Sequence, residues 1–349
     1  MQAFFKTVRQ LQDHINLLSK LDAKKLRNAY QVWKSYRQSR KTGVLVQPGL
    51  PLSVAFEPTT SCNLRCPECP SGLRSFTRPT GMLDQRLFEE SIDQMKSHLI
   101  YLTFYFQGEP YLHTRFLDMV RYASDRKIYT ATSTNAHYLD DKKAEATVRA
   151  GLDRLVISID GTTQESYENY RVGGTLTKVL EGTRNMVKWK RELKSKTPHL
   201  IFQFLVVKPN EHQIDDAKRL AKEIGVNEIQ FKTAQIYDYE NGSDLIPENS
   251  KYARYRKNLL GKFELKNPLH NECWKMWQGC VVTWDGRVVP CCFDKDAKHQ
   301  LGDLTQDSMK KIWTGHKYVN FRKSILQSRS NIDICQNCSE GLKISLTDG

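Results

Sequence analysis

Short apolar runs alternate with amphipathic stretches through the middle of the chain. Six runs have the length and β-branched or aromatic content of strands, and five stretches between them repeat apolar residues with a helical period. The strand-like runs are Ser53–Glu57, Tyr101–Gln107, Ile128–Thr134, Arg154–Ile159, Leu200–Val207 and Glu228–Lys232. The helical stretches are Asp84–Lys96, Thr114–Asp125, Asp140–Arg149, Leu176–Lys194 and Gln213–Glu223. This alternation is typical of parallel βαβ units.

Six such units are too few for a closed eight-stranded barrel, so an open partial barrel or a doubly wound sheet is expected. Of the two we predict an α/β fold with a partial (β/α)6, TIM-like barrel. Its ligands are expected at the C-terminal ends of the strands. The alternation stops near Tyr239, and two prolines and two glycines punctuate residues 43–51. We therefore predict a helical extension over residues 1–45, the barrel over 50–240, and a linker helix with a small cysteine-rich α+β domain over 241–349.

The predicted N-terminal extension is basic. Residues 1–42 hold ten Lys and Arg against two Asp, so they carry +8 of the net charge of +14. Apolar residues fall on one face of each of two predicted helices: Phe4, Val8, Leu11, Ile15 and Leu18 on the first, and Leu26, Tyr30, Trp33 and Tyr36 on the second. The helices either dock on an anionic membrane or a protein partner, or pack across the main domain with their charges in water. No nucleic-acid motif accompanies the charge, so we expect no specific nucleic-acid binding.

The sequence composition limits the cellular compartments in which we expect the protein. The longest apolar run, Ile100–Phe106, is far too short for a transmembrane helix, and Lys6 and Arg9 interrupt the N-terminal apolar stretch where a secretory signal would lie. Nine cysteines is an odd number in a 349-residue chain. We therefore expect metal ligation or reactive thiols in a reducing compartment rather than a disulfide framework, in a protein that is cytoplasmic or peripheral to the inner membrane face.

Three cysteines follow the first predicted strand. Cys62, Cys66 and Cys69 have a C-x3-C-x2-C spacing, and the next cysteine is Cys273. Three thiolates can hold three irons of a cubane cluster and leave the fourth iron open, whereas structural clusters and structural zinc use four ligands. A zinc knuckle is the alternative, but it needs a fourth Cys or His, and the nearest following histidine is His113.

The other six cysteines lie in residues 265–349 and form a second set. The stretch Val281–Cys292 predicts a β-hairpin around Asp285-Gly286. Such a hairpin brings Cys273 near Cys291, and the terminal Cys335-x-x-Cys338 closes a cage of four thiolates. On geometry alone, four cysteines bind either zinc or an iron–sulfur cluster.

These motifs make the chain resemble the radical S-adenosylmethionine (SAM) enzymes over roughly residues 52–340, and the first cysteine motif is a specific mark of that family. The resemblance implies a [4Fe–4S] cluster on Cys62, Cys66 and Cys69 that binds SAM. Gln107-Gly108-Glu109-Pro110 resembles the segment that binds the methionyl amine, although Gln107 stands where the family has glycine. The implied SAM-binding residues are Gly108, Glu109, Asn135, Ser158, Asp160 and Arg171.

Elementary chemistry agrees with several of these assignments. A carboxylate such as Glu109 suits the SAM amine, and Arg171 or the Ser158 hydroxyl suits its carboxylate. Taken singly, each of these residues is also an ordinary turn or cap residue, as Asp160-Gly161 illustrates.

The second cysteine set resembles the family's SPASM/twitch extension. It contains the C-x(9–15)-G-x4-C and C-x2-C elements but lacks the later C-x5-C-x3-C pieces. The resemblance therefore implies one auxiliary [4Fe–4S] cluster in a small auxiliary iron–sulfur domain. Its implied ligands are Cys273, Cys291, Cys335 and Cys338, with Cys280 as the main rival. Cys292 is expected to be a buried thiol near the cluster.

By the same resemblance we expect reductive SAM cleavage, hydrogen abstraction from an unactivated C–H bond, and an electron from a flavodoxin- or ferredoxin-type protein. The first substrate hypothesis is a small or membrane-associated molecule, such as a sugar, aminocyclitol or lipid head group, oxidised with the auxiliary cluster as electron acceptor. The second is a ribosomal peptide or protein that is cross-linked, epimerised or oxidised. A non-catalytic metal-binding scaffold is the third. The sequence does not identify the catalytic residues that contact the substrate.

Overall fold

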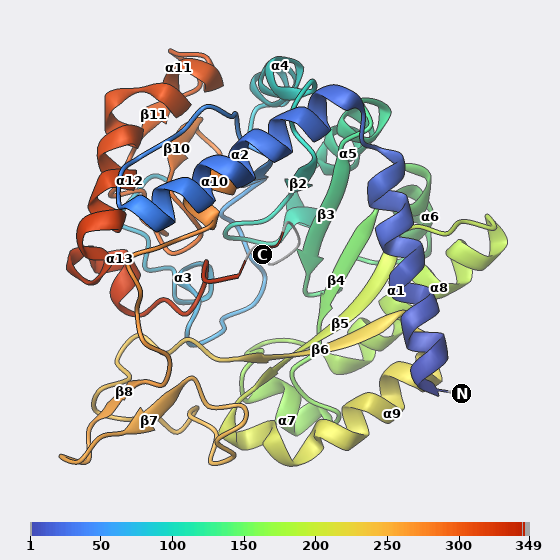
Figure 1. The fold of residues 1–349 in the computed structure, drawn as a ribbon. Coiled ribbons are helices and arrows are strands. Elements are labelled where there is room, and N and C mark those ends of the chain that lie inside the picture. The colour runs from blue at the N-terminus through green and yellow to red at the C-terminus, as the bar shows by residue number, and fades with distance from the viewer. Residues whose placement is uncertain (1, 344, 346–349) are drawn as a thin grey trace. The chain divides into compact units, whose positions relative to one another are not determined.

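The computed structural model describes residues 2–343 and 345, and the chain divides into two compact units. The first unit comprises the N-terminus to Leu18, Cys62–Ser75 and Ala131–Asn267. The second comprises Ser19–Ser61, Phe76–Thr130 and Pro268 to the C-terminus. Each unit is therefore assembled from segments that are far apart in the chain (Figure 1).

Parallel strands form the sheet of the first unit. Strands β3 (Tyr129–Thr134), β4 (Arg154–Ser158), β5 (His199–Val206) and β6 (Glu228–Thr233) pair in sequence order. The connecting helices are α6 (Asp141–Arg149), α7 (Gln164–Glu168), α8 (Leu176–Glu192) and α9 (Ile214–Ile224). β4 and β5 are mostly buried, as strands covered by crossover helices are.

The second unit also contains a mostly parallel core. Strand β1 (Ser53–Phe56) pairs in parallel with β2 (Tyr101–Thr103) and with β9 (Gly279–Val282). β10 (Arg287–Val289) and β11 (Gly302–Asp303) continue the sheet antiparallel. Its helices include α4 (Gln85–Met95), α5 (Phe116–Asp125), α11 (Met309–Thr314) and α12 (His316–Ser328). The predicted α/β fold with a mostly parallel sheet is confirmed, and the predicted hairpin forms between β9 and β10.

Both N-terminal helices form, as α1 (Gln2–Ser19) and α2 (Ala23–Thr42). In the described part of α1 the apolar face is not the packed one, since Leu11, Ile15 and Leu18 are exposed. Polar contacts attach α1 instead. Asp13 forms a buried ion pair with Arg154, and Asn16 Nδ2 donates to Asp153 Oδ1 over 2.8 Å.

Helix α2 likewise packs through a face offset from the predicted one. Its buried residues are Lys25, Asn28, Val32, Ser35, Tyr36 and Ser39. Tyr36 is thus the one member of the predicted apolar face that is buried, whereas Leu26 and Tyr30 are more than half exposed. Among the described residues, no helix is long and apolar enough to cross a membrane.

The predicted linker helix is wrong. All of residues 239–272 are described, and they contain a two-stranded hairpin, β7 (Tyr255–Lys257) and β8 (Phe263–Leu265), instead of a helix. Alternating side chains and a Gly261 turn favour strands here, because Tyr255 and Leu265 face the core of their unit while Arg256 and Glu264 pair in water. The short helix α10 (Lys275–Gln278) comes only after this hairpin.

Candidate functional site

The loop that carries the first three cysteines is folded tightly around Cys66. Cys66 is buried, whereas Cys62 and Cys69 are partly buried. The Cys69 amide donates to the Cys66 carbonyl over 3.3 Å, and Cys69 begins the short helix α3 (Pro70–Leu73). A Cβ at Gly72 would lie 2.5 Å from the Cys66 amide nitrogen, so only glycine allows this turn to close.

Two N–H donors of the same unit point at sulfur atoms of this loop. Arg171 Nη1 lies 3.8 Å from Cys66 Sγ, and Asn135 Nδ2 lies 3.9 Å from Cys62 Sγ. Burial raises the pKa of the Cys66 thiol, and the Arg171 guanidinium opposes that rise. Donors placed on sulfur favour the thiolate form, which is the form that binds iron.

Asp160 holds Arg171 in place. Arg171 Nε donates to Asp160 Oδ2, and the Leu205 amide donates to Asp160 Oδ1 over 2.7 Å. Asp160 is fully buried, and both of its carboxylate oxygens therefore bond within the protein. The ion pair raises the pKa of Arg171, even though burial acts in the opposite direction, so the guanidinium stays charged beside Cys66. Ser158, the last residue of β4, is buried in the same unit.

In the second unit, the Gly108-Glu109 segment is hydrogen-bonded to the chain that follows β1. The Glu109 amide donates to the Ser61 carbonyl over 2.8 Å, and Glu109 Oε1 accepts from the Tyr111 amide over 3.2 Å. Gly108 has φ +76°, and a Cβ there would lie 2.1 Å from the Thr59 carbonyl oxygen. The glycine of this motif is thus a steric requirement.

The four cysteines predicted as auxiliary ligands gather in the second unit. Burial raises the pKa of Cys291, and the neighbouring Cys292, Cys338 and Cys273 raise it further. Burial likewise raises the pKa of Cys335, and Cys273 adds to that rise. Cys292 therefore lies among the predicted ligands.

Arg329 is a cation beside this second set. Its Nη2 lies 3.2 Å from Cys338 Sγ, and its two terminal nitrogens bond the Glu272 and Glu340 carbonyls over 2.7 and 2.8 Å. The rival ligand Cys280 lies on β9, where burial raises its pKa to about 12 and Arg322 is the charged group that opposes the rise.

Each cysteine set has a guanidinium N–H donor beside one of its sulfurs. Within the described part of the chain, no three His, Cys, Asp or Glu side chains converge closely enough to hold one metal ion. Each cysteine of a [4Fe–4S] cluster binds a different iron, so its ligands lie farther apart. Thiols with guanidinium donors on their sulfurs also match the hydrogen bonding that tunes such clusters.

A cavity opens beside the second cysteine set. Its lining includes Tyr105, Lys275, Cys280, Cys291 and Cys292. Burial lowers the pKa of Lys275, but Cys292, Glu340 and Cys291 outweigh that effect and raise it, so the ammonium is charged. The sequence analysis missed Lys275, although its place two residues after Cys273 was a usable signal.

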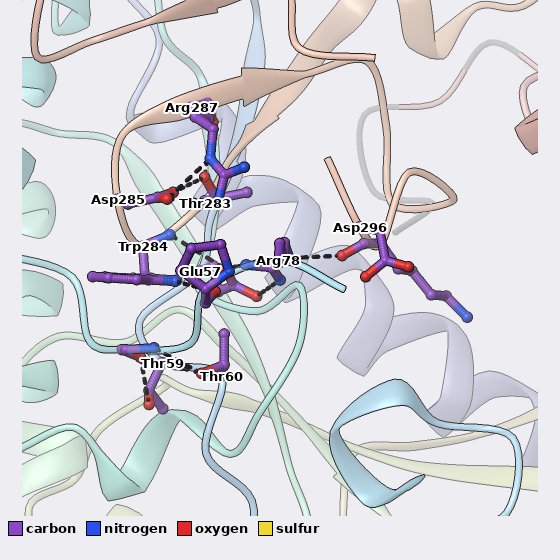
Figure 2. A network of polar contacts seen from close by, with 12 residues as sticks. Glu57, Thr59, Thr60, Arg78, Thr283, Trp284, Asp285, Arg287 and Asp296 are labelled. Carbon is purple, nitrogen blue, oxygen red and sulfur yellow. Dashed lines mark hydrogen bonds and ion pairs between the residues drawn. The ribbon is translucent and has the colours of Figure 1, made fainter. Parts of the chain in front are cut away.

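A buried ion pair that was not predicted closes the segment that holds the first cysteines. Figure 2 shows Glu57, just after β1, bonded to Arg78 by both guanidinium nitrogens, at 2.9 and 2.5 Å. Arg78 Nε also donates to the Lys295 carbonyl, and the Trp284 amide donates to Glu57. A glutamate at the end of a buried strand was the signal for it.

Two protein-family models match the chain. The radical SAM superfamily model covers residues 56–221, and the SPASM iron–sulfur cluster-binding domain covers residues 273–339. The tungsten-containing aldehyde ferredoxin oxidoreductase cofactor-modifying protein of Pyrococcus furiosus is 28% identical over 81% of this chain and 86% of its own length. The PqqA peptide cyclase of Gluconobacter oxydans is 27% identical over 70% of this chain and 71% of its own.

Solved structures agree on the fold. SuiB of Streptococcus suis, bound to SAM, superposes with a TM-score of 0.61 at 13% identity, covering 88% of this chain and 76% of its own. BtrN, in complex with SAM and 2-DOIA, gives a TM-score of 0.52 at 17% identity, covering 83% of this chain and 94% of its own. At these identities the likeness shows the fold alone.

Proposed function

Because the chain belongs to the radical SAM superfamily and carries a SPASM iron–sulfur domain, we propose that it oxidises a small or membrane-associated molecule at an unactivated C–H bond. The two domains imply SAM and [4Fe–4S] clusters as its cofactors. When bound, a [4Fe–4S] cluster with an open iron and SAM supply the radical that takes the hydrogen atom. We propose a flavodoxin- or ferredoxin-type protein as the electron donor.

The cysteines divide between two roles in this proposal. Cys62, Cys66 and Cys69 hold the SAM-binding cluster, and Arg171 and Asn135 direct N–H groups at their sulfurs. The auxiliary cluster is held by Cys273, Cys291, Cys335 and Cys338. Four thiolates leave no iron open, which favours electron acceptance over binding of the substrate.

For SAM itself, we propose Gly108 and Glu109 at the amine, with Asn135 and Ser158 as further contacts. Asp160 acts in this proposal through Arg171, because both of its carboxylate oxygens are already bonded within the protein. Arg171 then has two tasks, as a donor to Cys66 and as a cation near the SAM carboxylate.

The cavity beside the auxiliary cysteines carries the substrate part of the proposal. It is a concave pocket with mostly apolar residues and one charged side chain in its lining, as small-molecule sites commonly are. Its charged ammonium, Lys275, favours a substrate with a carboxylate or phosphate, which includes a lipid head group or a sugar phosphate.

Peptide modification is the second candidate, and the match to the PqqA peptide cyclase favours it. Adding a small anionic substrate and a candidate peptide separately, and following SAM turnover with each, distinguishes the two.

Anaerobic reconstitution tests the ligand assignment. Wild-type protein should hold about eight irons, and replacing either cysteine set with alanine should leave about four. Mössbauer spectra should show only [4Fe–4S] signals in each sample. Zinc in place of iron, or iron unchanged in either variant, would contradict the proposal.

A further inference from the structure

The tip of the β7–β8 hairpin is a built turn with two leucines at its end. The Asn258 amide donates to the Lys262 carbonyl over 2.8 Å, and Asn258 Oδ1 accepts from the Leu260 and Lys262 amides over 2.9 and 3.1 Å. Gly261, with φ +78°, completes the turn. The tip is therefore held by hydrogen bonds of its backbone and of the Asn258 side chain, and the leucine side chains take no part.

Both leucines point into solvent. Leu259 is 106% exposed and Leu260 is 86% exposed, the two highest values among the large exposed apolar residues of the described chain. The strands beneath them are anchored, because Tyr255, Phe263 and Leu265 pack into the apolar core of the first unit. Figure 1 shows this hairpin (orange) extending beyond the end of β6 in the same unit. The side chains of Leu259 and Leu260 contribute nothing to the packing of the hairpin. They are therefore available to bind a partner.

Two lysines flank the two leucines. Lys257 and Lys262 flank the turn and are both exposed. Residues 251–266 hold six Lys and Arg and one acid, Glu264, which Arg256 neutralises over 2.8 Å. An apolar end with a basic collar is complementary to an anionic lipid surface, where leucines enter the acyl boundary and lysines meet the phosphates.

We propose that the β7–β8 hairpin docks the protein on an anionic membrane by inserting Leu259 and Leu260. This inference is independent of the proposed reaction, because the hairpin contains no proposed cofactor or substrate residue.

A different observation carries a second lipid contact, on α2. Its solvent face exposes Leu26 and Tyr30, and Arg37 lies over the Trp33 ring at 4.9 Å. The helix has seven Lys and Arg and no acidic residue from Ala23 to Thr42. Aromatic and basic side chains on one helix face are typical of interfacial helices. We propose that α2 binds the same kind of surface.

Vesicle flotation of the full-length chain tests both contacts. Wild-type protein should float with phosphatidylglycerol-containing vesicles and much less with pure phosphatidylcholine, and added salt should weaken binding. L259S/L260S should reduce partitioning roughly tenfold, and K257Q/K262Q should reduce it with anionic vesicles only. L26S/Y30S tests α2 separately. The exposed pair K310Q/K323Q is the control for lost charge and should bind like the wild type.

Unchanged flotation of L259S/L260S would overturn the hairpin proposal, and unchanged flotation of L26S/Y30S would overturn the second. If wild-type protein ignores anionic vesicles but self-associates through Leu259 and Leu260 in sedimentation velocity, the leucines bind a second copy of this chain and the membrane proposal is wrong. Iron content measured on the same samples reports on folding independently of the proposed reaction.

Discussion

Arg78 and Glu57 form a fully buried bidentate ion pair that joins the two ends of the segment holding Cys62, Cys66 and Cys69 (Figure 2). Burial raises the pKa of Glu57, and hydrogen bonds from Arg78 oppose that rise. The guanidinium also lies over the Phe106 ring. Neither partner can be removed without leaving the other charge buried.

We predict that Arg78→Met destabilises the protein by about 3–5 kcal/mol, because it leaves the Glu57 carboxylate uncompensated. Denaturant unfolding of the anaerobic protein measures this. Arg86→Met is the matched control, since the Arg86–Glu90 pair is exposed and should contribute about 0–1 kcal/mol. The double variant E57Q/R78M should lose less than the two single variants summed, and strict additivity would mean that the pair is not coupled.

Gly108→Ala should abolish SAM-dependent activity and lower the melting temperature, because its Cβ would collide with the Thr59 carbonyl. Gly43→Ala is the control that separates the steric clash of the added Cβ from the strain of a positive φ. Gly43 has a similar φ, +69°, but nothing lies within 4 Å of its Cβ position, so that variant should lose only about 1 kcal/mol. Equal melting temperatures for the two variants would remove the steric argument.

Arg171→Met should make the SAM-binding cluster harder to reduce, because it removes a positive N–H donor 3.8 Å from Cys66 Sγ. We expect iron content to be retained and the midpoint potential in an EPR-monitored titration to become more negative. Asp160→Asn should shift the potential less, since it loosens the guanidinium without removing it. Arg184→Met, which replaces an exposed arginine of α8, should leave the potential unchanged.

His98 should make the fold sensitive to acid. Burial lowers its pKa to about 4, with help from Lys25, while the unfolded chain protonates it near pH 6.5. The unfolded state therefore binds the proton first as the pH falls. Stability should decline from about pH 6.5 to about pH 4, by up to roughly 3 kcal/mol. His98→Gln should flatten that part of the pH profile of unfolding; a profile unchanged by the substitution would contradict the assignment.

Lys275→Met tests the cavity. The variant should keep its iron and its basal SAM cleavage but lose the stimulation of cleavage by an anionic substrate, because the charged ammonium lines the cavity. Lys310→Gln, on the exposed face of α11, is the control. Undiminished stimulation in Lys275→Met would place the substrate elsewhere.

Much of the fold could be predicted because its signals are local. The six barrel strands and five helices form within a few residues of their predicted ends, and the turn at Asp285-Gly286 forms as expected. Contacts between distant residues could not be predicted by periodicity. Asp13 and Arg154 attach α1 so that Leu11, Ile15 and Leu18 are exposed, and β9 joins β1 across more than two hundred residues of chain.

The candidate site likewise contains residues that could be predicted from the sequence and residues whose role could not. Spacing identified Cys62, Cys66 and Cys69, because a short loop sets their geometry by itself. The role of Asp160 could not be predicted. That role depends on Arg171 and on the Leu205 amide, which donate hydrogen bonds to the two carboxylate oxygens of Asp160. The ligand assignments themselves stay predictions.

The most direct test of the central claim is the formation of 5′-deoxyadenosine from SAM by reconstituted protein with dithionite. Wild-type protein and Cys335→Ala should both form it, because the auxiliary site is not needed for cleavage. The triple variant C62A/C66A/C69A should form none. Wild-type protein with its full iron content that yields no 5′-deoxyadenosine, or a triple variant that still forms it, would contradict the account.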